Sequence, residues 1–208
     1  MNPVEFVQDF YAKYDAALPK LLSGEKVTCQ KGCSACCFQL IGVFPTEAIN
    51  IFASMVSLGD DGLRDLIRRC FLASRDLFAM PNIYDCFRLH VPCVFLQNNL
   101  CQIYPWRPIV CRYYFCLSDP KSCSGPMLSG VKLLDVHHQA GGAMMSHVHK
   151  MVLENPEIPT PYYGPLPAMM VWAMATVYTG GTKRWAEKKL AKLPPIQTWH
   201  KLVARGEG

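Results

Sequence analysis

The sequence carries little charge and no extended basic surface. Only 18% of its 208 residues are Asp, Glu, Lys or Arg and 50% are hydrophobic, which argues against a largely disordered chain. Basic and acidic residues balance through residues 1–182, so the whole net charge of +5 falls in residues 183–208. A nucleic-acid-binding protein needs a basic patch through much of its fold, so we predict no nucleic-acid partner. The basic segment at 183–192 is expected to form an amphipathic helix that is either solvated or contacts a protein partner.

The sequence also predicts no secretory signal and no membrane-spanning segment. The first nine residues include acids where a secretory signal would have an apolar run. In the uncharged stretch 158–182, prolines leave only about 168–179 as an apolar helix, which is shorter than the ~20 residues of a membrane span. We therefore expect a cytoplasmic protein without a transmembrane segment. Thiols stay reduced in the cytosol, so the 11 cysteines are expected to be metal ligands or buried apolar groups.

Common catalytic motifs are absent as well. We find no Ser/His/Asp arrangement, no Gly-rich phosphate loop and no H-E-x-x-H pattern. A loose histidine group contains two members, His147 and His149, that are two residues apart and would face different ways on a helix. We therefore expect polar surface histidines at this group, which consists of His137, His138, His147 and His149.

The hydrophobic pattern predicts a mainly α fold with a short β-hairpin. Asn2, Pro3 and Glu5 resemble a helix start, and apolar residues continue at helical spacing to Leu21, with Pro19 expected to kink or divide the helix. Further helices are predicted at 46–58, at 60–78, after Pro108 and, as one or two helices, at 127–154. We expect a Cys-rich metal-binding domain at residues 1–125 and a helical C-terminal extension at 126–208, packed on the same core.

The predicted hairpin covers residues 93–104 and turns at Asn98-Asn99. A two-residue turn would pair Leu96 with Cys101 and would place Cys93 and Cys101 on opposite faces. If both cysteines bind one metal, we expect a three-residue loop instead, with an Asn at positive φ.

Two groups of cysteines stand out. The first has four cysteines in nine residues, Cys29, Cys33, Cys36 and Cys37, and the second contains Cys93, Cys101 and Cys111. Thiolates are soft ligands that suit zinc, iron–sulfur clusters and copper. The spacing of Cys33 and Cys36 lets one tight loop present both sulfurs to one ion. We therefore predict that folding brings the two groups together around a metal centre.

Other residues are assigned to the surroundings of this centre or left open. Arg107, Arg112 and Lys31 could offset thiolate charge, and Tyr104 could donate a hydrogen bond to a ligand sulfur. Cys116 is a candidate extra ligand and Cys123 a weaker one. Cys70 is expected in the core because it lies on an apolar helical stripe with Leu63, Leu66, Ile67, Phe71, Leu77 and Phe78.

These motifs resemble a known family. Cys29-x3-Cys33-x2-Cys36-Cys37, followed by Cys93-Val94-Phe95-Leu96, Cys101-Gln102-Ile103-Tyr104 and Arg107-Pro108-x2-Cys111-Arg112, is similar to the CxxCxxCC family, described as a zinc- or iron-chelating domain. The resemblance covers residues 29–116 and departs in having three residues between Cys29 and Cys33, where the family usually has two. It implies metal binding, through an iron–sulfur cluster such as 4Fe–4S or through zinc or iron ions.

Two enzymatic alternatives remain beside simple metal binding. A similar Cys-rich region occurs in flagellin lysine methylases, which implies methyl transfer or S-adenosylmethionine chemistry as an alternative function. The spacing Cys29-x3-Cys33-x2-Cys36 also matches the cluster loop of radical S-adenosylmethionine enzymes. Those enzymes need repeated βα units, whereas this sequence predicts helices and one hairpin.

Overall fold

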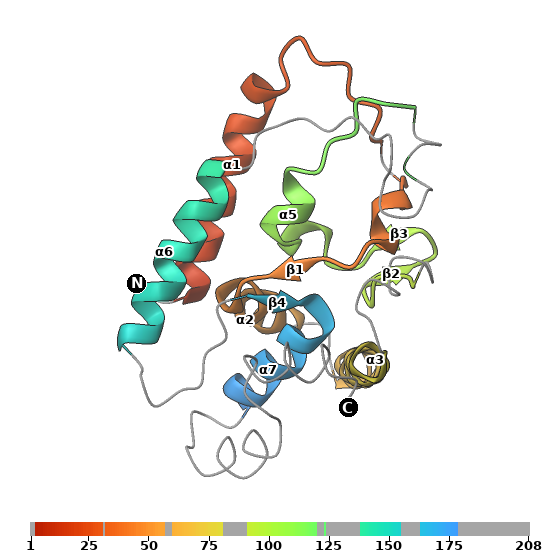
Figure 1. Cartoon of the computed structure of the whole chain (residues 1–208), viewed down its shortest axis with the longest axis vertical. Coiled ribbons are helices and arrows are strands. Elements are labelled where there is room, and N and C mark those ends of the chain that lie inside the picture. Colours follow the sequence, from red (N-terminus) through yellow and green to blue (C-terminus); the bar gives the residue numbers. More distant parts are fainter. Residues whose placement is uncertain are drawn as a thin grey trace.

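A computed structural model describes residues 3–30, 32–56, 60–80, 91–119, 123, 138–154 and 163–178. Over this part of the chain the fold is mainly helical with short antiparallel strand pairs, as predicted (Figure 1). The helices are α1 (Pro3–Leu21), η1 (Ala35–Phe38), α2 (Pro45–Met55), α3 (Asp60–Ala79), η3 (Tyr104–Trp106), α5 (Ile109–Arg112), α6 (His138–Glu154) and α7 (Leu166–Tyr178). The strands are β1 (Gly42–Val43), β2 (Leu96–Gln97), β3 (Leu100–Cys101) and β4 (Gly164–Pro165).

The larger hydrophobic core lies where α7 packs against α2 and α3. Its helical members recur at helical spacing and are fully or almost fully buried, and the hairpin region adds Phe95 and Ile103. The partly buried Cys93 and Cys101 pack against this core. The most buried helical members of this core are Ala48, Ile51, Phe52, Leu66, Cys70, Met169, Met170 and Ala173. The predicted burial of Cys70 is therefore confirmed.

A second cluster joins α1 to α6, which lie side by side (Figure 1). Val7 and Tyr11 of α1 pack with Met144 and Val148 of α6, and Ile109 at the start of α5 contacts the same cluster. Phe6 and His147 stack face to face, with ring centroids 3.7 Å apart. Since α5 carries Cys111, this cluster helps to position one candidate ligand.

The strand pairs are short, and one of them was not predicted. Gly42 of β1 pairs with Pro165 of β4, which ties the segment after η1 to the start of α7. In the hairpin, Leu96 pairs with Cys101 and Gln97 with Leu100, leaving a two-residue turn. The turn residues Asn98 and Asn99 have φ of 50° and 60°. The expected Asn at positive φ is confirmed, but the expected three-residue loop is wrong.

Several sequence predictions changed in detail. The helix α1 is not divided at Pro19, because this proline lies near the end of the helix and removes only one backbone N–H. Phe71 was expected on the buried stripe of α3 but is 51% exposed, since α7 covers only one side of α3. The helix α6 continues through Gly141 and Gly142. Asn2, Lys31, His137 and the basic segment 183–192 lie outside the described residues, as does Cys86, a cysteine to which the sequence assigned no role.

Candidate metal centre

Four candidate ligands from three separate segments come close together, and we call them the inner set: Cys36, Cys93, Cys101 and Cys111. Cys36 lies on η1, Cys93 precedes the hairpin, Cys101 lies on β3 and Cys111 lies on α5. Burial raises the pKa of the Cys111 thiol, and Cys93, Cys36 and Cys101 lie near enough for their charges to raise it further. In Figure 1, α5 lies on the side of β1 away from α7, and the β2–β3 hairpin lies to the right of β1.

The two cysteine-rich segments are joined directly by the backbone. The N–H of Cys93 donates to the carbonyl oxygen of Cys37 at 2.7 Å. The N–H of Leu96 donates back to the carbonyl of Cys93 at 2.9 Å, so Cys93 begins a turn before β2 and is not part of the strand. Strand alternation therefore does not separate Cys93 from Cys101, which explains how the two-residue hairpin still brings them together.

Backbone N–H groups point at two sulfurs of the inner set. Burial raises the pKa of Cys93 to about 11, and a hydrogen bond from the N–H of Phe95 opposes that shift. Burial likewise raises the pKa of Cys101, opposed by a hydrogen bond from the N–H of Ile103 and by the charge of Arg107. Hydrogen bonds to sulfur favour the thiolate, which is the form that binds a metal. The loops after both cysteines are thus shaped to hold a negative sulfur.

Cys36 and Cys37 are adjacent on η1 and play different parts. Their thiols share a hydrogen bond, which is the main reason that the pKa of Cys36 is raised, followed by burial. Arg107 lies near enough for its charge to lower the pKa of Cys36. Cys37 also receives the N–H of Cys93 at its carbonyl group. Cys37 is therefore a neighbour of the inner set through its backbone and through Cys36.

Cys29 and Cys33, predicted as ligands of the same centre, also lie near two further cysteines, Cys116 and Cys123. The N–H of Cys116 donates to the sulfur of Cys29 at 3.2 Å. Burial raises the pKa of Cys29, and charges on Cys33, Cys36 and Cys116 would raise it further. Cys123, which is only 4% exposed, lies beside Cys116. We call Cys29, Cys33, Cys116 and Cys123 the outer set.

The described cysteine thiols lie near one another, but their sulfur atoms do not surround a common metal position. Among the residues that the structure describes, no three His, Cys, Asp or Glu side chains stand in position to ligate a single ion, and no described cysteine forms a disulfide. Binding an ion therefore requires the cysteine side chains to turn from their thiol positions. Four thiols from rigidly joined segments are a donor set that suits zinc or iron.

Three residues predicted to surround the centre, Tyr104, Arg107 and Arg112, differ in their exposure and contacts. Tyr104 is 60% exposed, and the guanidinium of Arg107 lies 3.9 Å from the centroid of its ring. Arg107 also donates to the carbonyl of Tyr104 at 2.9 Å. Arg112 is 1% exposed, and its guanidinium binds the carbonyls of Arg107 and Pro105 and the carboxylate of Asp15. Arg107 thus carries its charge toward the thiols, whereas Arg112 braces the loop before Cys111.

A buried carboxylate that sequence analysis did not single out supports the same loop. Glu47 accepts hydrogen bonds from the hydroxyl of Tyr11 at 2.7 Å, the N–H of Ile109 at 2.6 Å and the N–H of Phe44 at 3.0 Å. Burial raises its pKa, and these hydrogen bonds partly offset the shift. The sequence signal was the Phe44-Pro45-Thr46-Glu47 start of α2, in which Glu47 stands three residues after the cap. Glu47 thereby fixes the start of α5 against α1 and α2.

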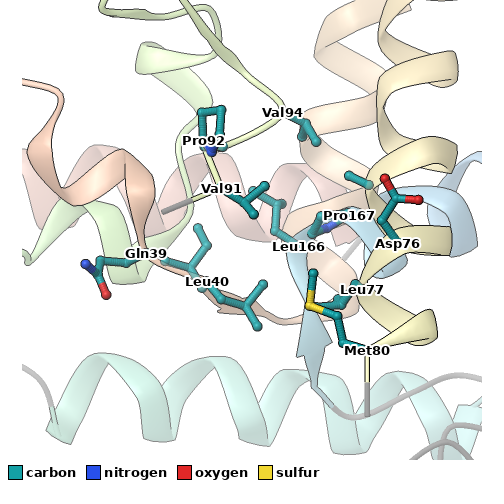
Figure 2. Close-up of a pocket in the computed structure, with 13 residues that line it drawn as sticks. Gln39, Leu40, Asp76, Leu77, Met80, Val91, Pro92, Val94, Leu166 and Pro167 are labelled. Carbon is teal, nitrogen blue, oxygen red and sulfur yellow. The ribbon is translucent and has the colours of Figure 1, made fainter. Parts of the chain in front are cut away.

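An apolar groove of about 180 Å³ lies beside Cys93 (Figure 2). Leu40, Leu77, Val91 and Leu166 line it, together with residues at the end of α3 and the start of α7. Gln39 and Asp76 are the polar side chains of its lining. The groove is suited to an aliphatic group and borders the inner set on one side.

The structure thus defines a small helical domain with a thiol-rich centre. The family model of the CxxCxxCC domain, described as "Putative zinc- or iron-chelating domain", matches residues 28–124, just under half of the chain. The matched region contains both the inner and the outer set, and the resemblance inferred from the cysteine pattern is confirmed. No curated protein and no solved structure matches the chain. No helix in the described part of the chain is long and apolar enough to cross a membrane.

Proposed function

We propose that this chain is a metal-binding protein that holds zinc or iron through the thiolates of the inner set. The observation that carries the proposal is that Cys36, Cys93, Cys101 and Cys111 come together although they lie on three segments up to 75 residues apart. Cysteine thiolates are common ligands of zinc ions and of iron–sulfur clusters in proteins. The backbone hydrogen bonds to Cys93 and Cys101 support the same conclusion.

The donor set suits either of two kinds of centre. A tetrahedral zinc or iron ion takes four thiolates, and a 4Fe–4S cluster also takes four. A zinc ion would act as a cross-link between η1, the hairpin and α5, whereas a cluster would supply electron transfer when bound. In both cases the protons of the four thiols must leave when the metal binds.

The decisive experiment is anaerobic purification of the full chain, followed by metal and sulfide analysis and a visible spectrum. Iron and sulfide in equal amounts with broad visible absorption would identify a cluster, and a colourless protein with stoichiometric zinc would identify an ion. Cys101→Ser is expected to lose the metal of the inner set. Cys70→Ser is the matched control, because Cys70 is a buried cysteine on α3 outside both sets. Full metal content in Cys101→Ser would overturn the proposal.

Methyl transfer is the second candidate, and the groove beside Cys93 is the feature that bears on it. An enzyme of this kind needs a substrate site next to its metal centre, and the groove has that position. Its lining is mostly apolar, however, while S-adenosylmethionine carries a charged amino acid and a nucleoside. We therefore place metal binding first. A rise in thermal stability on adding S-adenosylmethionine to the metal-loaded protein, absent with adenosine alone, would favour the enzyme.

A further inference from the structure

We propose that the outer set, Cys29, Cys33, Cys116 and Cys123, forms a second metal site that binds one tetrahedral divalent ion such as Zn²⁺. This site rests on the same thiolate chemistry as the proposed function but concerns different residues. The inner set would keep its own metal, whichever kind that is.

A short backbone bridge brings the two halves of the outer set together. The N–H of Thr28 donates to the carbonyl of Cys116 at 2.9 Å, and the hydroxyl of Thr28 donates to the carbonyl of Ser118 at 2.7 Å. In return, the N–H of Cys116 donates to the sulfur of Cys29 at 3.2 Å. These hydrogen bonds hold Cys29 and Cys116 together although they are 87 residues apart, and the N–H of Cys116 points at the sulfur of Cys29. A backbone N–H at a cysteine sulfur is typical of thiolate metal sites.

The other two members lie beside this bridge. The thiols of Cys116 and Cys123 share a hydrogen bond, and both residues are almost fully buried. Charges on Cys29 and Cys33 would act on Cys123, so all four sulfurs share one neighbourhood. Cys29 and Cys33 are exposed, which leaves one side of the set open to solvent. A metal ion could enter and leave from that side.

A buried hydroxyl beside the outer set has no hydrogen-bond partner among the described residues. The side-chain oxygen of Tyr114 is buried and makes no hydrogen bond within the part of the chain that the structure describes. Charges on Cys36, Cys123, Cys116 and Cys29 would all act on this hydroxyl, which places it among the thiols. A buried hydroxyl without a hydrogen-bond partner destabilises the folded state. Thiolates bound to a cation would give Tyr114 an acceptor that neutral thiols supply only weakly.

Two sites explain the arrangement better than one. Eight cysteines in the two sets exceed the four ligands of a single zinc ion. Charges on Cys93, Cys36 and Cys101 act on Cys111, whereas charges on Cys116, Cys29 and Cys33 act on Cys123. Cys36 also acts on Cys29 and therefore borders both sets. In the outer set, four S–H bonds would break, four protons would pass to solvent and four metal–sulfur bonds would form. No electron is transferred.

The test compares one variant of each set in the full chain. Cys33→Ser is the outer variant, because Cys33 is exposed and its replacement leaves the core intact. Cys111→Ser is the inner variant, and Cys70→Ser is the control. Each protein is purified anaerobically, supplied with Zn²⁺, freed of excess metal by gel filtration and analysed for zinc, iron and sulfide.

We expect Cys33→Ser to lose one equivalent of zinc and to keep the inner metal, and Cys111→Ser to show the reverse. Full metal content in Cys33→Ser would overturn the outer site and leave the inner one standing. Loss of all metal from both variants would indicate one shared cluster and would also overturn it. Loss of one zinc from Cys33→Ser with no loss from Cys111→Ser would support the outer site and refute the proposed inner centre.

A second measurement does not depend on variants. Because the outer set opens to solvent, Zn²⁺ should protect Cys29 and Cys33 from alkylation by iodoacetamide, as mapped by mass spectrometry of the wild-type chain. Equal labelling of both residues with and without zinc would contradict the proposal.

Discussion

The guanidinium of Arg112, the residue that follows Cys111, lies 3.9 Å from the centroid of the Tyr11 ring. The same group donates to the carbonyl of Arg107 at 3.0 Å and also binds the carbonyl of Pro105 and the carboxylate of Asp15. One side chain thus joins α1 to the loop that leads into α5. The position of Cys111 depends on this brace as well as on the hydrophobic cluster around Ile109.

Replacing Arg112 by Lys should therefore destabilise the fold. An ammonium group cannot make the several hydrogen bonds of the planar guanidinium, and we expect a loss of roughly 2–3 kcal/mol in the free energy of unfolding. Urea unfolding followed by circular dichroism measures it. Arg68→Lys on the exposed side of α3 is the control, with an expected change within about 0.5 kcal/mol. Equal effects of the two variants would contradict the proposed role of Arg112.

Glu47 should make stability depend on pH. Burial raises its pKa in the folded state, an effect that hydrogen bonds from Ile109, Phe44 and Tyr11 only partly offset. The folded state therefore holds the proton more tightly than the unfolded state. The resulting stabilisation is fully present below the unfolded pKa of about 4.3 and is lost as pH rises through the folded pKa.

The measurement compares wild type with Glu47→Gln, which does not titrate. Urea unfolding of both proteins at several pH values between about 4 and 8 should show the wild type losing stability relative to the variant as pH rises. The cysteines are common to both proteins, so their titration cancels in the difference. Glu25→Gln, at an exposed carboxyl, is the control. A difference that grows in favour of the wild type with rising pH would refute the prediction.

The hairpin turn offers a test of the structure near Cys101. Asn98 and Asn99 both have positive φ, a conformation that Gly and Asn tolerate and β-branched residues do not. Asn99→Gly should be neutral or slightly stabilising, whereas Asn99→Val should cost roughly 1–2 kcal/mol. Thermal unfolding of the two variants in parallel tests whether Asn99 has the positive φ that the structure gives it. A harmless Asn99→Val would mean that the turn has another conformation.

Metal removal should weaken the fold, since the inner set connects three segments. A tightly bound ion that is absent from the unfolded state stabilises by several kcal/mol, so stripping it should lower Tm by roughly 10 °C. Differential scanning calorimetry before and after chelation measures the change, and adding back the metal should restore the original Tm. An unchanged Tm after complete metal loss would mean that the bound metal does not support the fold.

Local sequence signals accounted for most of the helices. The sequence alone indicated the apolar spacing of α3, the Pro108 start of α5 and the apolar run of α7. A helix that packs on a core has apolar residues that recur along the sequence at helical spacing. The β1–β4 pair was not visible. Each of its strands is two residues long, and pairing between Gly42 and Pro165 leaves no periodic pattern.

The sequence by itself showed that residues 28–124 resemble the CxxCxxCC domain and that two cysteine groups are involved, since residue type and spacing are local properties. Only the tertiary structure decided which cysteines stand together. Cys29 lies beside Cys116 and near Cys123, and Cys36 lies near Cys111 as well as near Cys29. These proximities depend on long-range hydrogen bonds, such as those from Thr28 to Cys116 and from Cys93 to Cys37. Such bonds form only when distant segments are packed on a common core.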